Sequence, residues 1–190
     1  MGIQLLDQNT INKIAAGEVI ERPSSVVKEL VENAIDAGAT AVTVEAKEGG
    51  ISFIRVTDNG SGIKKDEIDI AFKRHATSKI KSIEDLLTVS SLGFRGEALA
   101  SIAAVSQIEL ITKTKDDITG TRYQSEGSEV ISVEDIGAPD GTTFIIRNLF
   151  FNTPVRRKFL KSAMTEAGYI NALMQYICLL YTSPSPRDCS

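Results

Sequence analysis

The feature that most constrains the fold is a pair of strand-like segments joined by two glycines. Residues 41–46 alternate apolar with polar side chains, and residues 51–57 are rich in apolar ones, so each segment is typical of a β-strand. The intervening Gly49-Gly50 predicts a hairpin turn. The second strand runs directly into Asp58-Asn59-Gly60-Ser61-Gly62, which is typical of a tight turn. An aspartate carboxylate should therefore stand at the end of a sheet strand.

Helical periodicity flanks this hairpin. Apolar spacing predicts helices over Thr10–Ile20 and, most clearly, over residues 24–37, where Pro23 suits a first turn and Gly38 a stop. The remaining expected elements are helices over about Lys65–Lys73 and from near Gly96, a long mobile segment over 75–95, strands over 108–114, 120–125, 129–136 and 142–148, and helices near 154–162 and 166–177. This order lacks the regular strand–helix alternation of a doubly wound fold, so we predict an α+β fold.

Composition indicates one soluble domain. The chain has 190 residues, 42% hydrophobic and 24% charged, as is typical of globular proteins. It has no apolar run near the roughly 20 residues that cross a bilayer, and no secretory signal pattern. Cys178 and Cys189 make neither a disulfide framework nor a metal-ligand set. We therefore expect a cytoplasmic protein with no membrane partner.

The end of the chain differs in character from the rest. The Ser/Pro-rich stretch from Thr182 breaks off an otherwise amphipathic helix and cannot bury a core. We therefore divide the chain into a domain over residues 1–178 and a disordered tail over residues 179–190. The tail resembles a string that recurs as an adaptor or read-through artefact, which suggests that it is not native; sequencing the source gene across codon 178 tests this.

Glu29 and Asn33 lie four residues apart and so share one face of the helix over residues 24–37. Leu30 and Val31 between them should point into the core. A carboxylate here can accept a proton from an attacking water, and an amide oxygen can ligate Mg²⁺. The same spacing is common on solvated helix faces, so alone it does not identify a site.

Two further elements have the chemistry to hold a nucleotide. Asp58 can accept a hydrogen bond from an exocyclic amine, and the glycines after it allow close backbone approach or positive φ. Residues 92–99 place two glycines before a helix start near Glu97, where free N–H groups attract anions. Thr77-Ser78-Lys79 adds hydroxyls and an ammonium group. There is no Walker P-loop, and each element alone is also typical of an ordinary turn or helix cap.

Charge offers a second kind of partner. The formal net charge of −4 argues against a dedicated nucleic-acid coat protein, but a local basic patch can still attract DNA. Arg156-Arg157-Lys158 with Lys161 is such a cluster, and it predicts either a solvated helix face or contacts to DNA phosphates. His75, the only histidine, is more typical of a structural or surface role than of catalysis.

Taken in order, these segments resemble the GHKL ATPase superfamily, which includes DNA gyrase B, the Hsp90 chaperones, histidine kinases and MutL. Its four motifs match Glu29 to Asn33, Asp58 to Gly62, the Gly93–Glu97 region and Gly141-Thr142-Thr143. Longer blocks resemble the MutL family of DNA mismatch repair proteins: residues 14–23 (IAAGEVIERP), 74–79 (RHATSK), 93–99 (GFRGEAL) and 151–160 (FNTPVRRKFL). The resemblance covers residues 1 to about 177.

The resemblance implies the Bergerat ATP-binding fold, a mixed, mostly antiparallel sheet with helices packed on one face. It implies an ATPase with ATP and Mg²⁺ as cofactors, in which Glu29 is the general base, Asn33 holds Mg²⁺ and Asp58 binds the adenine amine. The other nucleotide contacts that it implies are Gly62, the lid residues Thr77, Ser78 and Lys79, the triphosphate-lining Arg95, Gly96, Glu97, Ala98 and Leu99, and Thr142 and Thr143 at the adenine end.

The same resemblance implies an ATP-driven switch in mismatch repair. Nucleotide would promote homodimerisation of the full-length protein and couple a MutS-type mismatch sensor to downstream factors, with weak DNA binding through basic patches. MutL proteins continue into a second domain that contributes a phosphate-site lysine, so this chain is expected to hydrolyse ATP weakly or not at all. A nucleotide-binding module without turnover is the alternative. A histidine-kinase-type protein would need a phosphoacceptor histidine domain, whereas His75 lies in the lid-like segment.

Overall fold

The computed structural model describes residues 2–74 and 96–181. Its centre is a six-stranded sheet with the spatial order β1 (Val42–Lys47), β2 (Phe53–Asp58), β6 (Gly141–Arg147), β3 (Gln107–Lys113), β4 (Gly120–Glu126) and β5 (Glu129–Ile136). The helices are α1 (Gln8–Val19), α2 (Pro23–Asp36), α3 (Ile68–Ala71), α4 (Ala98–Ala104), α5 (Pro154–Phe159) and α6 (Ala163–Tyr181), with 3-10 turns η1 (Glu48–Gly50) and η2 (Lys65–Glu67). The α+β class predicted from the sequence is confirmed.

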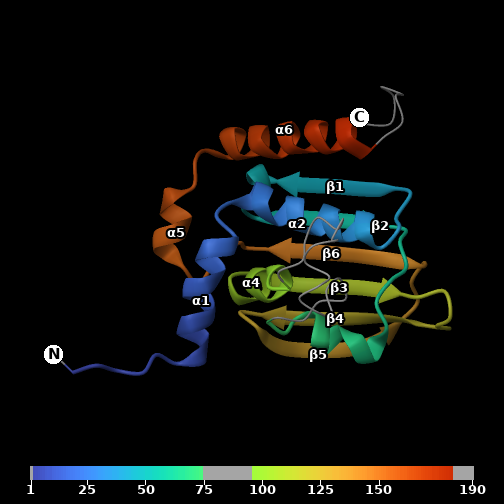
Figure 1. The fold of residues 1–190 in the computed structure, drawn as a ribbon, viewed down its shortest axis with the longest axis horizontal. Helices are drawn as coiled ribbons and strands as arrows, with labels where there is room; N and C mark the ends of the chain where they lie inside the picture. The colour runs from blue at the N-terminus through green and yellow to red at the C-terminus, as the bar shows by residue number, and fades with distance from the viewer. Residues whose placement is uncertain (1, 75–95, 182–190) are drawn as a thin grey trace, which may run out of the picture.

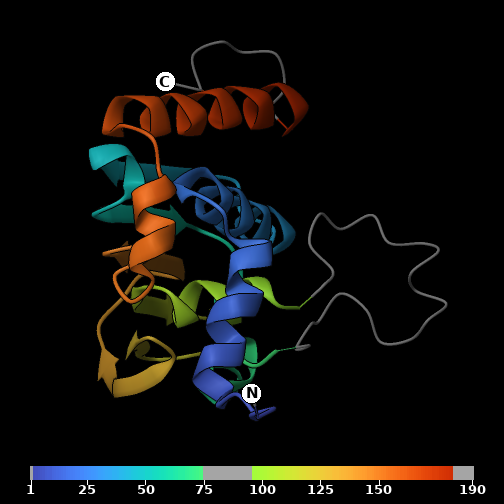
Figure 2. The ribbon, with the colours of Figure 1, turned by 90° about the vertical axis from the view of Figure 1, so that its left-hand side faces the viewer.

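The helices gather on one face of the sheet and leave the other face open (Figures 1 and 2). Helix α2 packs against β1 and β2, α4 packs against β4, and α1 packs against α4. Helix α6 runs alongside the edge strand β1 and contacts α2 and η1, while α5 lies between α1 and α6 at one end of the sheet (Figure 1). Among the described residues, no helix combines the length and apolar character that a membrane span requires.

Alternation along the strands explains why one face is covered. In β2 and β6, the side chains of Ile54, Val56, Phe144 and Ile146 point toward the helices and are at most 5% exposed. They share one core with the apolar face of α2, including Leu30. Each such side chain contributes about 1.5–3 kcal/mol through burial. The core therefore fixes the helix that carries Glu29 against the strand that ends at Asp58.

Most predicted elements appear within a few residues of their expected bounds. The helix expected over Lys65–Lys73 is instead split into η2 and the four-residue α3. The sheet, expected to be mixed, has only antiparallel pairs among the described strands. The last helix continues to Tyr181, past the expected boundary at residue 178. The segment expected to be mobile, residues 75–95, and the tail from Thr182 lie outside the described residues.

The open face of the sheet is a charged surface. Glu109 of β3 accepts hydrogen bonds from Arg122 Nε of β4 at 2.8 Å and from Arg147 Nη1 of β6 at 2.9 Å. Burial disfavours the ionised carboxylate, but the hydrogen bonds from Arg147 and Arg122 outweigh it, so the pKa of Glu109 lies below its ordinary value. Arg55 and Glu45 pair across β2 and β1 on the same face. Ion pairs therefore link neighbouring strands across this face.

Candidate functional site

Helix α2 positions Glu29 and Asn33. Pro23 opens the helix at a position where its missing N–H costs nothing. Leu30 and Val31 between the two polar residues are 1% and 2% exposed and lie in the core, as predicted. Glu29 and Asn33 themselves are half-buried. The helix thus holds a carboxylate and a carboxamide side by side at the margin of the core.

Asp58, the last residue of β2, lies on the helix-covered face of the sheet. Its Oδ1 accepts a hydrogen bond from the Gly60 N–H at 2.8 Å, and the backbone of Thr142 in β6 also donates to the carboxylate. Burial is nevertheless the stronger influence and raises the pKa of Asp58 above its ordinary value. The prediction of an aspartate presented at a strand end is therefore confirmed.

Asn59 bonds the loop after Asp58 to the segment between α2 and β1. Its Oδ1 accepts hydrogen bonds from the N–H groups of Thr40 and Ala41 at 2.8 and 3.0 Å, and its Nδ2 donates to Thr40 Oγ1 at 2.8 Å. The Ser61 N–H adds a bond to the Ala37 carbonyl at 3.0 Å. The sequence motifs did not predict this role of Asn59. Its position after Asp58 was the only available signal, because both partners are identified only by the tertiary fold.

Two glycines allow backbone segments to meet around Asp58. Gly62 has a φ of 72°, and a Cβ there would collide with the carbonyl group of Lys113 at the end of β3. Gly141 has a φ of 116°, and a Cβ there would collide with the Asp58 carbonyl. Both positions need glycine for conformation and for space. The expected positive φ is found at Gly62, and the close approach seen there is to the protein's own backbone.

The structure separates Thr142 from Thr143. Thr142 stands opposite Asp58 in the β2–β6 register and shares its helix-covered face. Thr143 stands opposite Thr57, and its Oγ1 donates to Thr57 Oγ1 at 3.2 Å on the open face. Because side chains alternate along a strand, only Thr142 is on the Asp58 side of the sheet. The contact expected of Thr143 at the adenine end stays a prediction, and the geometry favours Thr142 for it.

The expected phosphate-binding segment is described only in part. Gly96 has a φ of 63°, and Glu97 precedes the first turn of α4, which begins at Ala98. Leu99 packs against the core, so it anchors this segment from within. His75 and the expected contacts Thr77, Ser78, Lys79 and Arg95 lie outside the described residues.

Oxygen chemistry at α2 fits Mg²⁺. Asn33 offers an amide oxygen and Glu29 a carboxylate, and Mg²⁺ commonly takes one or two protein oxygens together with waters and substrate phosphates. The described residues contain no cluster of three His, Cys, Asp or Glu side chains that could hold a metal alone. The donor set therefore suits a metal that arrives with a phosphate ligand.

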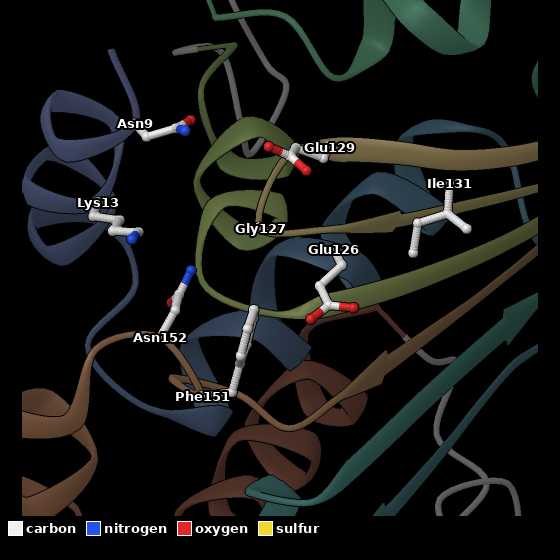
Figure 3. A pocket seen from close by; sticks show the side chains of 8 residues that line it. All are labelled: Asn9, Lys13, Glu126, Gly127, Glu129, Ile131, Phe151 and Asn152. Atoms are coloured by element: carbon white, nitrogen blue, oxygen red, sulfur yellow. The ribbon is translucent and has the colours of Figure 1, made fainter. Parts of the chain in front are cut away.

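A cavity of about 300 Å³ lies elsewhere, between α1 and the β4–β5 hairpin (Figure 3). Asn9 and Lys13 of α1 line one side, and Glu126 and Glu129 line the hairpin side. It shares no residue with the expected nucleotide contacts. Two carboxylates and one lysine also make it a poor site for a phosphate.

The basic cluster is divided by the fold. The guanidinium of Arg156 turns inward, where Nη1 donates to the carbonyls of Gly17 and Ile20 at the end of α1, at 2.9 and 3.0 Å. A Cβ on Gly17 would collide with this guanidinium. Arg157, Lys158 and Lys161 remain exposed. Arg156 is therefore a capping group for α1, and the surface available to DNA phosphates is smaller than expected.

The chain is similar in sequence to known ATPases and to MutL proteins. Residues 20–142 match the family described as histidine kinase-, DNA gyrase B- and HSP90-like ATPase. The chain is 68% identical over 177 residues to the DNA mismatch repair protein MutL of Agathobacter rectalis and 55% identical over 179 residues to that of Acidobacterium capsulatum. These alignments cover 93% and 94% of this chain but 27% of each relative. The chain thus spans about a quarter of the length of these relatives.

The fold is also similar to solved structures of DNA repair proteins. The Aquifex aeolicus MutL ATPase domain complexed with ADP superposes with a TM-score of 0.67 and 37% identity, covering 85% of this chain and 56% of that one. The N-terminal domain of a DNA repair protein gives a TM-score of 0.69 and 29% identity, covering 88% and 47%. Both similarities extend over most of this chain, so the fold and the sequence motifs point to the same proteins.

Burial of Asp58 leads to a pH-dependent prediction. Because its folded-state pKa is raised, its contribution to stability is complete below about pH 4, the unfolded value, and is lost as pH rises through the folded pKa. Asp58→Asn should therefore raise the melting temperature at neutral pH, and the gain should vanish toward about pH 3. Thermal melts of both proteins across this range measure the effect.

The control for this prediction is Asp117→Asn. The Thr114 hydroxyl hydrogen-bonds to Asp117 and holds its pKa below the ordinary value, so this substitution should not raise the melting temperature. An Asp58→Asn protein that melts at or below the parent temperature at neutral pH would contradict the prediction.

Gly17 and Arg156 should be energetically coupled. Gly17→Ala should destabilise the parent by about 1 kcal/mol, because the added methyl displaces the guanidinium from the carbonyls of Gly17 and Ile20. In an Arg156→Ala background the same change should cost nothing, or stabilise by up to about 1 kcal/mol through helix propensity. Urea unfolding of the four proteins gives the coupling energy. Equal costs of Gly17→Ala in both backgrounds would show that the two residues are independent.

Proposed function

Because the chain belongs to the family of histidine kinase-, DNA gyrase B- and HSP90-like ATPases, and is of the MutL type within it, we propose that residues 1–178 bind and hydrolyse Mg-ATP. The observation that carries the proposal is the placement of the Asp58 carboxylate. This side chain is half-buried at a strand end and held by backbone donors, and the loop after it is bonded through the Ser61 N–H to the Ala37 carbonyl at the end of the helix that bears Glu29 and Asn33.

At the adenine end, the Asp58 carboxylate accepts a hydrogen bond from the exocyclic amine of the base. The carboxylate is fixed by the Gly60 and Thr142 N–H groups, so little conformational freedom is lost when it accepts a further hydrogen bond. Gly62 allows the loop after Asp58 to pack against the Lys113 carbonyl, and Thr142 lies on the same face of the sheet as Asp58. The contact proposed from the family motif for Thr143 would require a path around the strand, and Thr142 replaces it here.

At the phosphate end, Asn33 holds Mg²⁺, which neutralises charge on the phosphates when bound. By the family motifs, the backbone N–H groups of Gly96, Glu97, Ala98 and Leu99 would bind the triphosphate. The same motifs assign nucleotide contacts to Arg95 and to the lid residues Thr77, Ser78 and Lys79, which lie outside the described residues. These roles rest on the family motifs. Phosphoryl transfer to water is mainly a matter of positioning and charge neutralisation, so this set of groups supplies most of what the reaction needs.

Glu29 takes the proton from the attacking water. It is half-buried on α2, one turn before Asn33, so a base and a metal ligand lie along one helix face. The family takes a further phosphate-site lysine from a second domain, so residues 1–178 on their own should hydrolyse ATP weakly or not at all. A nucleotide-binding module without turnover is the second candidate.

In the full-length protein, we propose that ATP acts as a switch in the cytoplasm. Nucleotide binding would promote homodimerisation and couple a MutS-type mismatch sensor to downstream repair factors. DNA would bind weakly through exposed basic side chains. The support is the high identity to MutL proteins over this domain.

Glu29→Gln should separate binding from chemistry. The variant should keep Mg-ATP affinity within about threefold and lose turnover by about 10²–10⁴-fold, the usual contribution of a general base. Single-turnover hydrolysis with the chain in excess over labelled ATP detects slow chemistry, and calorimetry gives the affinity. Glu21→Gln, an exposed residue just before α2, is the control and should match the parent. Equal turnover by the parent and Glu29→Gln would show that Glu29 is not the general base.

The exposed basic side chains Arg157, Lys158 and Lys161 should carry DNA binding. Reversing all three to Glu, with Arg156 kept because it caps α1, should weaken duplex binding and lower the slope of log affinity against log salt by up to about 3. Fluorescence anisotropy at several salt concentrations measures both. Reversal of Lys64, Lys65 and Lys115 changes the net charge equally at another exposed site. If both triple variants bind alike, the patch has no specific role.

A further inference from the structure

Thr112, near the end of β3, has a buried hydroxyl and belongs to none of the sequence motifs. The residue is 1% exposed. Its Oγ1 accepts a hydrogen bond from the Ile63 N–H at 2.8 Å and lies 3.2 Å from the Gly141 carbonyl and 2.9 Å from Thr142 Oγ1. Ile63 and Gly141 are 49 and 29 residues away along the chain. One side chain thus joins three separate segments.

These contacts use the full capacity of a hydroxyl group. A threonine hydroxyl has one O–H to donate and two lone pairs to accept with. The O–H donates to the Gly141 carbonyl, one lone pair accepts from the Ile63 N–H, and the other accepts from the Thr142 hydroxyl. A buried group satisfied in this way is costly to remove, because its partners are left without hydrogen bonds. The hydroxyl therefore specifies one arrangement of the three segments.

Both segments to which Thr112 bonds lie next to Asp58. Ile63 directly follows the Asp58–Gly62 loop, so its bond to Thr112 fixes the far end of that loop. Thr142 stands opposite both Asp58 and Thr112 in the strand register, and its backbone donates to the Asp58 carboxylate. Gly141 packs against the Asp58 carbonyl with no room for a Cβ. Thr112 thus holds the loop on one side of the carboxylate and the strand on the other.

We propose that Thr112 is a positioning residue that aims the Asp58 carboxylate at the exocyclic amine of the bound base. It acts through the Ile63 amide and the Gly141–Thr142 segment and does not itself touch the nucleotide. The inference rests on the proposed function, in which adenine binds at Asp58. It goes beyond that function by assigning selectivity for the 6-amino group to a side chain two strands away from the adenine anchor.

The test compares ATP with purine riboside triphosphate, which lacks the 6-amino group. Calorimetry gives the affinity of each nucleotide for the parent, Thr112→Val, Thr112→Ala and Thr112→Ser. Loss of the hydroxyl should lower the preference for ATP about tenfold, the effect of roughly one misplaced hydrogen bond, and change affinity for the analogue less than about twofold. Thr112→Ser keeps the hydroxyl and should restore the parent preference. The alanine variant avoids the contact that a valine methyl would make with the Gly141 carbonyl.

Thr121→Val is the matched control. Thr121 stands opposite Thr112 on β4, is 5% exposed and lies one strand farther from Asp58. Its variant should show the parent preference even if its melting temperature falls. An equal loss of preference in Thr121→Val, or an equal loss of affinity for both nucleotides in the Thr112 variants, would overturn the inference in favour of a general packing role.

The outcomes also separate this inference from the proposed function. A parent that binds ATP and the analogue equally, or an Asp58→Asn variant that keeps the parent preference, overturns the adenine assignment and this inference with it. A parent that prefers ATP through Asp58, together with Thr112 variants that keep that preference, overturns the inference alone. Melting temperatures measured alongside confirm that each variant is folded at the temperature of the binding assay.

Discussion

The register of three antiparallel strands is the constraint on which the site depends. β2, β6 and β3 align so that Asp58, Thr142 and Thr112 form one row across the sheet. Because side chains alternate between faces, a slip of one residue in any strand would move its member of the row to the open face. The hydrophobic core enforces this register, since the same slip would also expose residues such as Ile54 and Ile146. Packing thereby sets the geometry of the polar site.

The row formed by Asp58, Thr142 and Thr112, with the glycines around it, lowers the stability of the fold. Asp58 would be easier to accommodate as a neutral side chain, and its raised pKa expresses this. Gly62 and Gly141 likewise accept the larger conformational entropy loss of glycine so that backbones can meet. These are local departures from the most stable choice of residue, and they occur together at one end of the sheet. Such departures are typical of binding sites, where function opposes stability.

Local patterns in the sequence predicted what local rules control. The spacing of Glu29 and Asn33 on a helix, the strand that ends at Asp58, and the α+β class all follow from periodicity and turn residues within short windows. Thr142 and Thr143 were both expected at the adenine end, because the motif alone does not say which of two adjacent residues faces the helices. Only the pairing of β6 with β2 decides that, and this pairing joins residues far apart in the chain.

The residues that sequence reasoning missed or misassigned all act over long sequence separations. Asn59 bonds to a segment 18 to 19 residues away, and Arg156 reaches across more than 130 residues to the end of α1. For anyone interpreting natural variants, Arg156 illustrates the risk of reasoning from composition. A screen that scores DNA binding would register its loss, and the basic run around it would suggest a direct contact. The defect would instead be a displaced N-terminal helix, and a compensating change would have to be sought at Gly17 and not on the DNA.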